Sequence, residues 1–125
     1  MDDHRLLTHL RTVLCEEGFV RFCQALGGTR VYVPYKLRDD NEIVQAVGRD
    51  AADLLSRTFA PATIRVPLAR RERALFFRAK QGLSNSAIAR KLGITEGGVN
   101  RLFAREQDLP DKLASGRSPA QLTLL

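Results

Sequence analysis

The first half of the chain contains two stretches in which apolar residues recur every three or four positions, the spacing of one helix face. The first stretch covers residues 2–26. Gly18 lies inside it, and we predict that this glycine interrupts or kinks the helix, which then ends at Gly27 and Gly28. The second stretch covers residues 43–59 and predicts one amphipathic helix after a polar loop.

Each helical stretch is followed by a short alternation of apolar and polar residues that ends in proline, at 29–34 and at 62–67. This pattern is typical of a strand with one solvent-facing side. A shift of 33 residues, the distance from Pro34 to Pro67, superimposes the apolar positions of both helix–strand stretches and indicates an internal duplication. Because a lone strand leaves its backbone groups unpaired, we expect the two strands to pair antiparallel about a local pseudo-two-fold axis. Pairing between two chains is the alternative.

The outward face of such a ribbon carries polar side chains. These are candidate contacts to a DNA backbone or minor groove, and an ordinary solvent-facing surface explains them equally well. The side chains are Arg30, Tyr32, Thr63 and Arg65.

Residues 83–104 contain two short helical patterns separated by Gly93. Gly93 tolerates the left-handed conformation that ends a helix, and Ala89 leaves room for two crossing helices. Thr95 can cap the second helix, whose Val99 turns back towards the first. The spacing predicts a helix-turn-helix in which the second helix is the recognition helix. An ordinary helical hairpin with solvated charges is the alternative.

The polar residues outside the shared core of this motif are candidate DNA contacts. Arg101 is the first candidate for a guanine contact, because a guanidinium can donate two hydrogen bonds to that base. Close approach of backbone to DNA, or ordering on binding, would account for the two poor helix formers Gly97 and Gly98. The recognition-helix candidates are Thr95, Glu96, Gly97, Gly98, Asn100, Arg101 and Arg105. The candidate phosphate contacts are Ser84, Asn85, Ser86, Arg70, Arg71, Arg73, Arg78, Lys80 and Arg90.

Residues 68–81 form a further predicted helix, which supports the motif through Leu75, Phe76 and Ala79. The expected organisation is a scaffold or dimerisation region at 1–67, a DNA-binding region at 68–105 and a flexible tail at 106–125. The expected fold class is mainly α, with a short two-stranded antiparallel ribbon and a C-terminal helix-turn-helix.

The net charge of +6 is unevenly distributed along the chain. Residues 65–105 hold ten Lys and Arg against two Asp and Glu, whereas the segments before and after each hold one more acidic than basic residue. The excess positive charge therefore coincides with the predicted groove-binding motif. This coincidence favours phosphate contacts over a merely solvated basic face.

The sequence gives little support to an enzyme, a cofactor or a metal site. It contains no glycine-rich phosphate loop, and His4 and His9 are five residues apart, which does not place them on one helix face. Cys15 and Cys23 have no second pair at metal-binding spacing, so we expect buried thiols. No apolar run approaches membrane-spanning length, and the first residues are acidic where a signal peptide is basic. We expect a cytoplasmic, nucleoid-associated protein without a membrane partner.

The sequence of residues 27–34 is Gly-Gly-Thr-Arg-Val-Tyr-Val-Pro, and Gly82-Leu83-Ser84 precedes the predicted helix-turn-helix. This combination resembles the Mor family of transcription activators, known from Mu-like bacteriophages and prophages. The resemblance spans residues 10–105. It implies an activator of phage or prophage genes that binds double-stranded DNA, acts with RNA polymerase and dimerises through an N-terminal helical region. The chain departs from the simplest members in carrying two helix–strand units, which leaves open whether it is a homodimer or pairs its strands internally.

Other functions remain open at this stage. Within DNA binding, the chain could be a repressor or the DNA-recognition subunit of a phage packaging or replication complex. From another class, it could be a helical protein-binding adaptor whose C-terminal peptide docks in a bacterial sliding clamp. The clamp-like residues are Gln121, Leu122, Leu124 and Leu125. Binding that weakens steeply with salt favours DNA over a protein partner.

Overall fold

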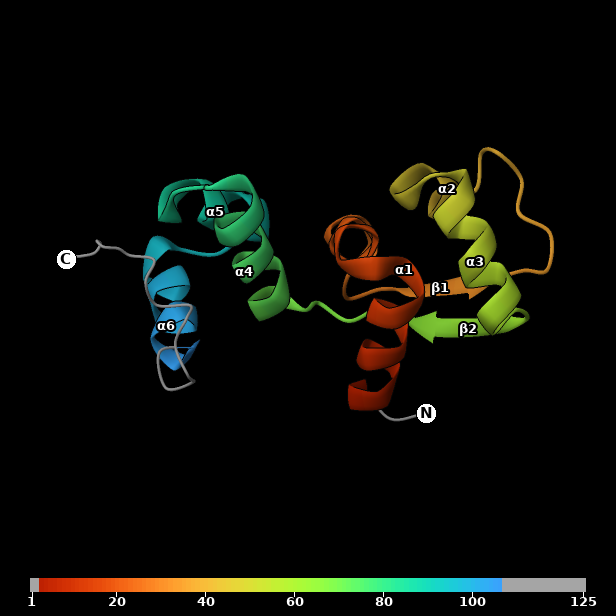
Figure 1. The fold of residues 1–125 in the computed structure, drawn as a ribbon, viewed down its shortest axis with the longest axis horizontal. Coiled ribbons are helices and arrows are strands. Elements are labelled where there is room, and N and C mark those ends of the chain that lie inside the picture. Colours follow the sequence, from red (N-terminus) through yellow and green to blue (C-terminus); the bar gives the residue numbers. More distant parts are fainter. Residues whose placement is uncertain (1–2, 107–125) are drawn as a thin grey trace. The chain divides into compact units, whose positions relative to one another are not determined.

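The computed structural model describes residues 3–106, which are mainly helical and include one two-stranded antiparallel sheet, as expected (Figure 1). The described residues divide into two compact units, with the boundary between Phe76 and Phe77. In chain order the elements are α1 (Asp3–Leu26), β1 (Arg30–Val33), α2 (Glu42–Val47), α3 (Arg49–Phe59), β2 (Ala62–Arg65), α4 (Arg70–Gln81), α5 (Asn85–Leu92) and α6 (Glu96–Glu106).

The two strands pair with each other inside one chain, and this confirms the antiparallel ribbon. Val31 lies opposite Ile64, and both are buried beneath the helices. The polar side chains predicted to face outwards are all exposed, namely Arg30, Tyr32, Thr63 and Arg65. Helices α2 and α3 lie on the same side of the ribbon (Figure 1).

The structure repeats itself at the spacing found in the sequence. Cys15 interrupts α1 with φ 58° and ψ 177°, and Gly48, 33 positions later, separates α2 from α3 with φ 90° and ψ 167°. Each repeat is therefore a helix, a one-residue break, a second helix and a strand. The paired residues Val31 and Ile64 are also repeat equivalents, so a pseudo-two-fold axis passes through this pair.

Two predictions about the helices were wrong. The first helix bends at Cys15 and not at Gly18, which lies buried inside the helix with Leu14 close to it. Residues 43–59 form two helices, because Gly48 breaks them, and not one. A one-residue break is easily missed in the pattern, because the apolar residues on both sides of it still turn towards one core.

The core of the first unit is built from equivalent positions of the two repeats. Leu10 and its equivalent Ile43 are fully buried, and so are Phe22 and its equivalent Leu55. Cys23 is also buried, as predicted, and this burial raises the pKa of its thiol to about 12. Cys15 is exposed, contrary to the prediction, because it occupies the bend between two helical segments.

The backbone of Cys15 provides a test of the repeat. Its φ of 58° with ψ of 177° lies in a region that is costly for any residue with a Cβ. Cys15→Gly is therefore expected to raise the free energy of unfolding by about 1 kcal/mol, after allowance for the larger entropy that glycine gives the unfolded chain. Urea denaturation followed by circular dichroism measures the change. Cys15→Ala removes the same thiol but keeps the strain, so a gain as large as that of Cys15→Gly would contradict this explanation.

Candidate nucleic-acid interface

A short turn joins α5 to α6, and a side-chain hydroxyl caps the first turn of each helix. At the start of α5, the Ser84 Oγ accepts a hydrogen bond of 3.1 Å from the Ala87 N–H. Gly93 follows α5 in the left-handed conformation, with φ 70° and ψ 34°. The Thr95 Oγ1 then accepts a hydrogen bond of 3.0 Å from the Gly98 N–H at the start of α6. The expected local roles of Gly93 and Thr95 are thus confirmed.

The apolar core of the second unit fixes the two helices against each other. Ile88 of α5 and Val99 of α6 are fully buried, and Leu92 is 8% exposed. Helix α4 contributes Phe77, whose ring has the Lys91 Nζ 5.6 Å from its centroid. The predicted support through Ala79 was wrong, because that residue is exposed.

Arg78 connects the three helices of this unit. Its Nε donates a hydrogen bond of 2.9 Å to the Leu83 carbonyl, and its Nη2 donates to the Asn85 Oδ1. Its guanidinium carbon lies 4.7 Å from the centroid of the Phe103 ring on α6. Partial burial lowers the pKa of Arg78 from its ordinary value, and the arginine remains charged at neutral pH.

Asn85 extends this network to the predicted recognition helix. Its Nδ2 donates a hydrogen bond of 2.6 Å to the Asn100 Oδ1. A continuous polar path therefore runs from Arg78 on α4 through Asn85 on α5 to Asn100 on α6. The sequence contained no signal for this path, because its members are seven and fifteen residues apart and look like ordinary surface polar residues.

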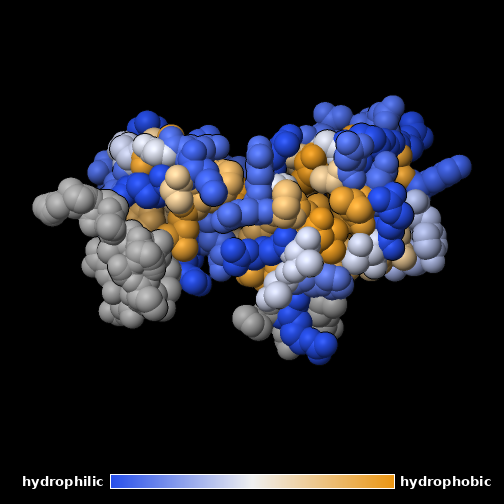
Figure 2. All heavy atoms as spheres, viewed as in Figure 1, coloured by the Kyte–Doolittle hydropathy of each residue, from blue (hydrophilic) through white to orange (hydrophobic). Residues whose placement is uncertain are grey.

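Several predicted contact residues thus also have intramolecular roles. The hydroxyls of Ser84 and Thr95 cap helices, and the Ser86 Oγ accepts a hydrogen bond of 2.9 Å from Arg90. Arg101 and Arg105 differ from these residues. Both are exposed on α6, and neither forms an ion pair with an acidic side chain of residues 5–105. On the face of this unit drawn in Figure 2, hydrophilic residues lie beside exposed hydrophobic ones.

Arg73 was wrongly predicted to contact phosphate, because it is only 5% exposed. Its Nε and Nη2 donate to the Gln24 Oε1 at 3.1 and 2.7 Å, and its Nη1 donates to the Leu68 carbonyl at 3.0 Å. Burial lowers the pKa of Arg73. This arginine fixes the first turn of α4 to the end of α1. Its neighbour Arg71 is exposed and lies 3.5 Å from Glu72.

The two glycines at the start of α6 have different environments. A Cβ on Gly98 would lie 3.3 Å from the Ile94 Cδ1, so packing favours glycine there. A Cβ on Gly97 would meet no atom closer than 3.6 Å. Packing therefore does not explain Gly97, and close approach of its backbone to a ligand stays a prediction. Glu96 lies in the first turn of α6, where a negative charge suits the helix dipole.

The remaining predicted residues are readily placed. Arg70 and Lys80 are exposed on α4, and the ribbon residues belong to the other unit. The clamp-like residues Gln121, Leu122, Leu124 and Leu125 lie outside the described part of the chain. Within residues 3–106, no helix is long and apolar enough to cross a membrane. Nor does this part of the chain gather three metal-ligating side chains of the His, Cys, Asp and Glu types.

Comparison of the chain with known protein-family models, with curated proteins and with solved structures gives no match.

Proposed function

We propose that the chain is a sequence-specific DNA-binding transcription regulator of Mor type, in which α5, the turn and α6 form a helix-turn-helix. The proposal rests on two properties of the basic residues on α6, namely their exposure and their lack of an acidic partner within residues 5–105. Arg101 and Arg105 project from a helix whose orientation is fixed by a buried core and by the Asn85–Asn100 hydrogen bond, and no acidic side chain of residues 5–105 neutralises them. A rigid helix with free cations suits the major groove.

The residues of this unit would divide their roles. Arg101 would read a guanine through two parallel hydrogen bonds. Arg105, Arg90 and Lys80 would contact phosphates, which position the protein without reading sequence. The Asn100 side chain would chiefly orient α6, because its oxygen already accepts from Asn85. RNA polymerase is the proposed protein partner of an activator of this type.

The internal pairing of β1 with β2 supports a further part of the proposal. Each chain satisfies its own strand pairing, so the ribbon does not require a second chain. Residues 3–106 contain one α5–turn–α6 arrangement. One chain would therefore bind one DNA site by itself, and we expect the enriched DNA motif to lack two-fold symmetry.

The experiment is a selection from random duplex DNA, followed by affinity measurements at two salt concentrations. The wild type is expected to enrich one motif, and its affinity should fall steeply between the low and the high salt concentration. Arg101→Ala is expected to weaken binding to that motif about tenfold and to relax the preference at one base position. Arg57→Ala is the matched control, because Arg57 is an exposed arginine of α3 in the other unit.

The outcomes separate the parts of the proposal. If neither protein enriches a motif and binding is insensitive to salt, DNA recognition is ruled out and a protein-binding adaptor is favoured. If a motif is enriched but Arg101→Ala leaves it unchanged, the role of Arg101 is wrong. A palindromic motif bound by two chains would contradict binding by a single chain and would leave the DNA-binding function intact.

A further inference from the structure

Two arginines lie directly opposite each other on the outward face of the ribbon. Arg30 pairs with Arg65 in the register, and both side chains are exposed. The preceding pair is hydrogen-bonded, with the Val66 N–H donating to the Thr29 carbonyl at 2.9 Å. Arg30 and Arg65 therefore form a non-hydrogen-bonded pair, in which the Cα atoms are only about 4.5 Å apart. Like charges at this distance destabilise a sheet.

Within residues 5–105, no acidic side chain compensates this repulsion. In that range neither Arg30 nor Arg65 lies within ion-pair distance of a carboxylate. The duplicated scaffold also shows that charge is not needed at these positions. The repeat equivalents of Arg30 and Arg65 are Thr63 and Tyr32, which lie opposite each other on the other side of the pseudo-two-fold axis and are uncharged. Both ribbon arginines thus gather at one end of a pseudo-symmetric surface.

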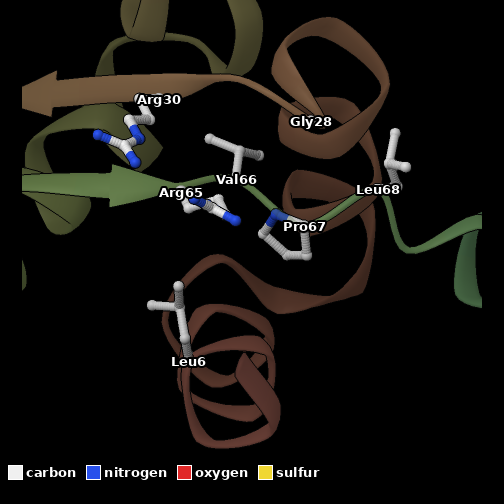
Figure 3. A pocket seen from close by; sticks show the side chains of 7 residues that line it. All are labelled: Leu6, Gly28, Arg30, Arg65, Val66, Pro67 and Leu68. Carbon is white, nitrogen blue, oxygen red and sulfur yellow. The ribbon is translucent and has the colours of Figure 1, made fainter. Parts of the chain in front are cut away.

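The same end of the ribbon is hollowed. Arg30 and Arg65 line a pocket of about 480 Å³, which is within the range of small-molecule sites. Figure 3 shows the Leu6 side chain pointing from α1 towards Arg65, with Pro67 beside the pocket. The pocket joins two guanidinium groups to an apolar wall, and the wall and floor are formed by Leu6, Gly28, Val66, Pro67 and Leu68.

We propose that this pocket binds a small organic anion, a carboxylate or a phosphate monoester that carries an apolar group. The anionic group lies between the two guanidinium groups, which donate paired hydrogen bonds to such oxygens. The apolar group packs against Leu6 and Leu68, and Leu68 is 43% exposed. A DNA phosphate would satisfy the arginines but would leave the apolar wall unused. This binding function is additional to DNA recognition by α6.

The test is a nuclear magnetic resonance titration of the full chain with three separate probes, phenyl phosphate, inorganic phosphate and phenol. Phenyl phosphate is expected to bind about tenfold or more tightly than either of the other probes, because it alone uses both parts of the pocket. The backbone amides of Arg30, Arg65 and Leu68 should shift more than those of Tyr32 and Thr63, which lie on the other side of the pseudo-two-fold axis.

Variants separate the two parts of the pocket. The double variant Arg30→Gln with Arg65→Gln is expected to weaken phenyl phosphate binding at least about tenfold. The control Arg57→Gln removes a positive charge from α3 and is expected to leave the phenyl phosphate affinity unchanged. Leu68→Ser is expected to lower the affinity for phenyl phosphate to that for inorganic phosphate. Circular dichroism spectra check that each variant folds.

Two results would overturn the proposal. One is a phenyl phosphate affinity no higher than that of inorganic phosphate and of phenol. The other is a double variant that keeps its phenyl phosphate affinity. If phenyl phosphate does not bind and the double variant instead loses affinity for the selected duplex, the two arginines are a DNA-backbone contact. The affinity of α6 for DNA, tested through Arg101, is measured independently of all these outcomes.

Discussion

Gly27→Ala is expected to lower the free energy of unfolding by about 3 kcal/mol, the largest effect predicted for a single methyl group in this chain. A Cβ at this position would lie 2.4 Å from the Cys23 carbonyl oxygen and 3.1 Å from the Pro67 carbonyl oxygen. Both are backbone atoms, so a side-chain rotation cannot relieve the overlap. The last turn of α1 would have to open at the Cys23 carbonyl, and Gly27 would have to move away from Pro67.

The measurement is urea denaturation followed by circular dichroism, with Gly97→Ala as the matched control. Gly97 is an exposed helical glycine at which an added Cβ meets no atom closer than 3.6 Å. That control is expected to be neutral or to stabilise the chain by up to about 1 kcal/mol, because alanine favours a helix. A Gly27→Ala variant as stable as the wild type would show that the two backbone segments are not packed this closely.

The ribbon could be predicted from the sequence because two independent patterns agreed. Alternation with period two assigned Val31 and Ile64 to the buried face, and the 33-residue shift made them equivalents. Antiparallel pairing of equivalent strands about a pseudo-two-fold axis follows from this equivalence, and the observed register, in which Val31 meets Ile64, has this symmetry. Local pattern and global fold give the same answer here.

The breaks at Cys15 and Gly48 could not be predicted from the same patterns. A cysteine gives no local signal for a positive φ, since most residues with a Cβ avoid that conformation. A strained conformation such as that of Cys15 persists only where the surrounding structure holds it, and this is a tertiary effect. Comparison with the second repeat contained the only available hint, because Gly48 is the residue type that this conformation suits.

In the candidate site, the number of basic residues in the sequence overstates the number of basic side chains available to a ligand. The sequence assigned all the basic residues of α4 to phosphate contacts, but two of them have structural roles. Arg73 donates to Gln24, which is 49 residues away in sequence, and no local pattern could indicate that partner. Arg78 is engaged with α5 and α6. Fewer basic side chains of α4 are therefore available for the proposed DNA contacts than the composition suggests.

Arg78→Met is expected to destabilise the second unit by about 2 kcal/mol. The substitution keeps much of the side-chain volume and removes the donors to the Leu83 carbonyl and to Asn85. Hydrogen bonds from a charged group are worth roughly 1.5–3 kcal/mol, and solvent exposure of this arginine places the expected loss towards the lower end. Loss of the contact with the Phe103 ring adds to the effect.

The same variant should also weaken DNA binding, and Lys80→Met distinguishes the cause. Lys80 is an exposed cation in the last turn of α4, so its loss removes one charge and leaves the stability nearly unchanged. Lys80→Met should reduce the salt dependence of DNA binding by about one phosphate contact. Arg78→Met should instead speed amide hydrogen exchange throughout α5 and α6, because the Arg78–Asn85–Asn100 path that orients α6 is lost. If Arg78→Met behaves like Lys80→Met in both measurements, Arg78 acts as a surface charge and does not position α6.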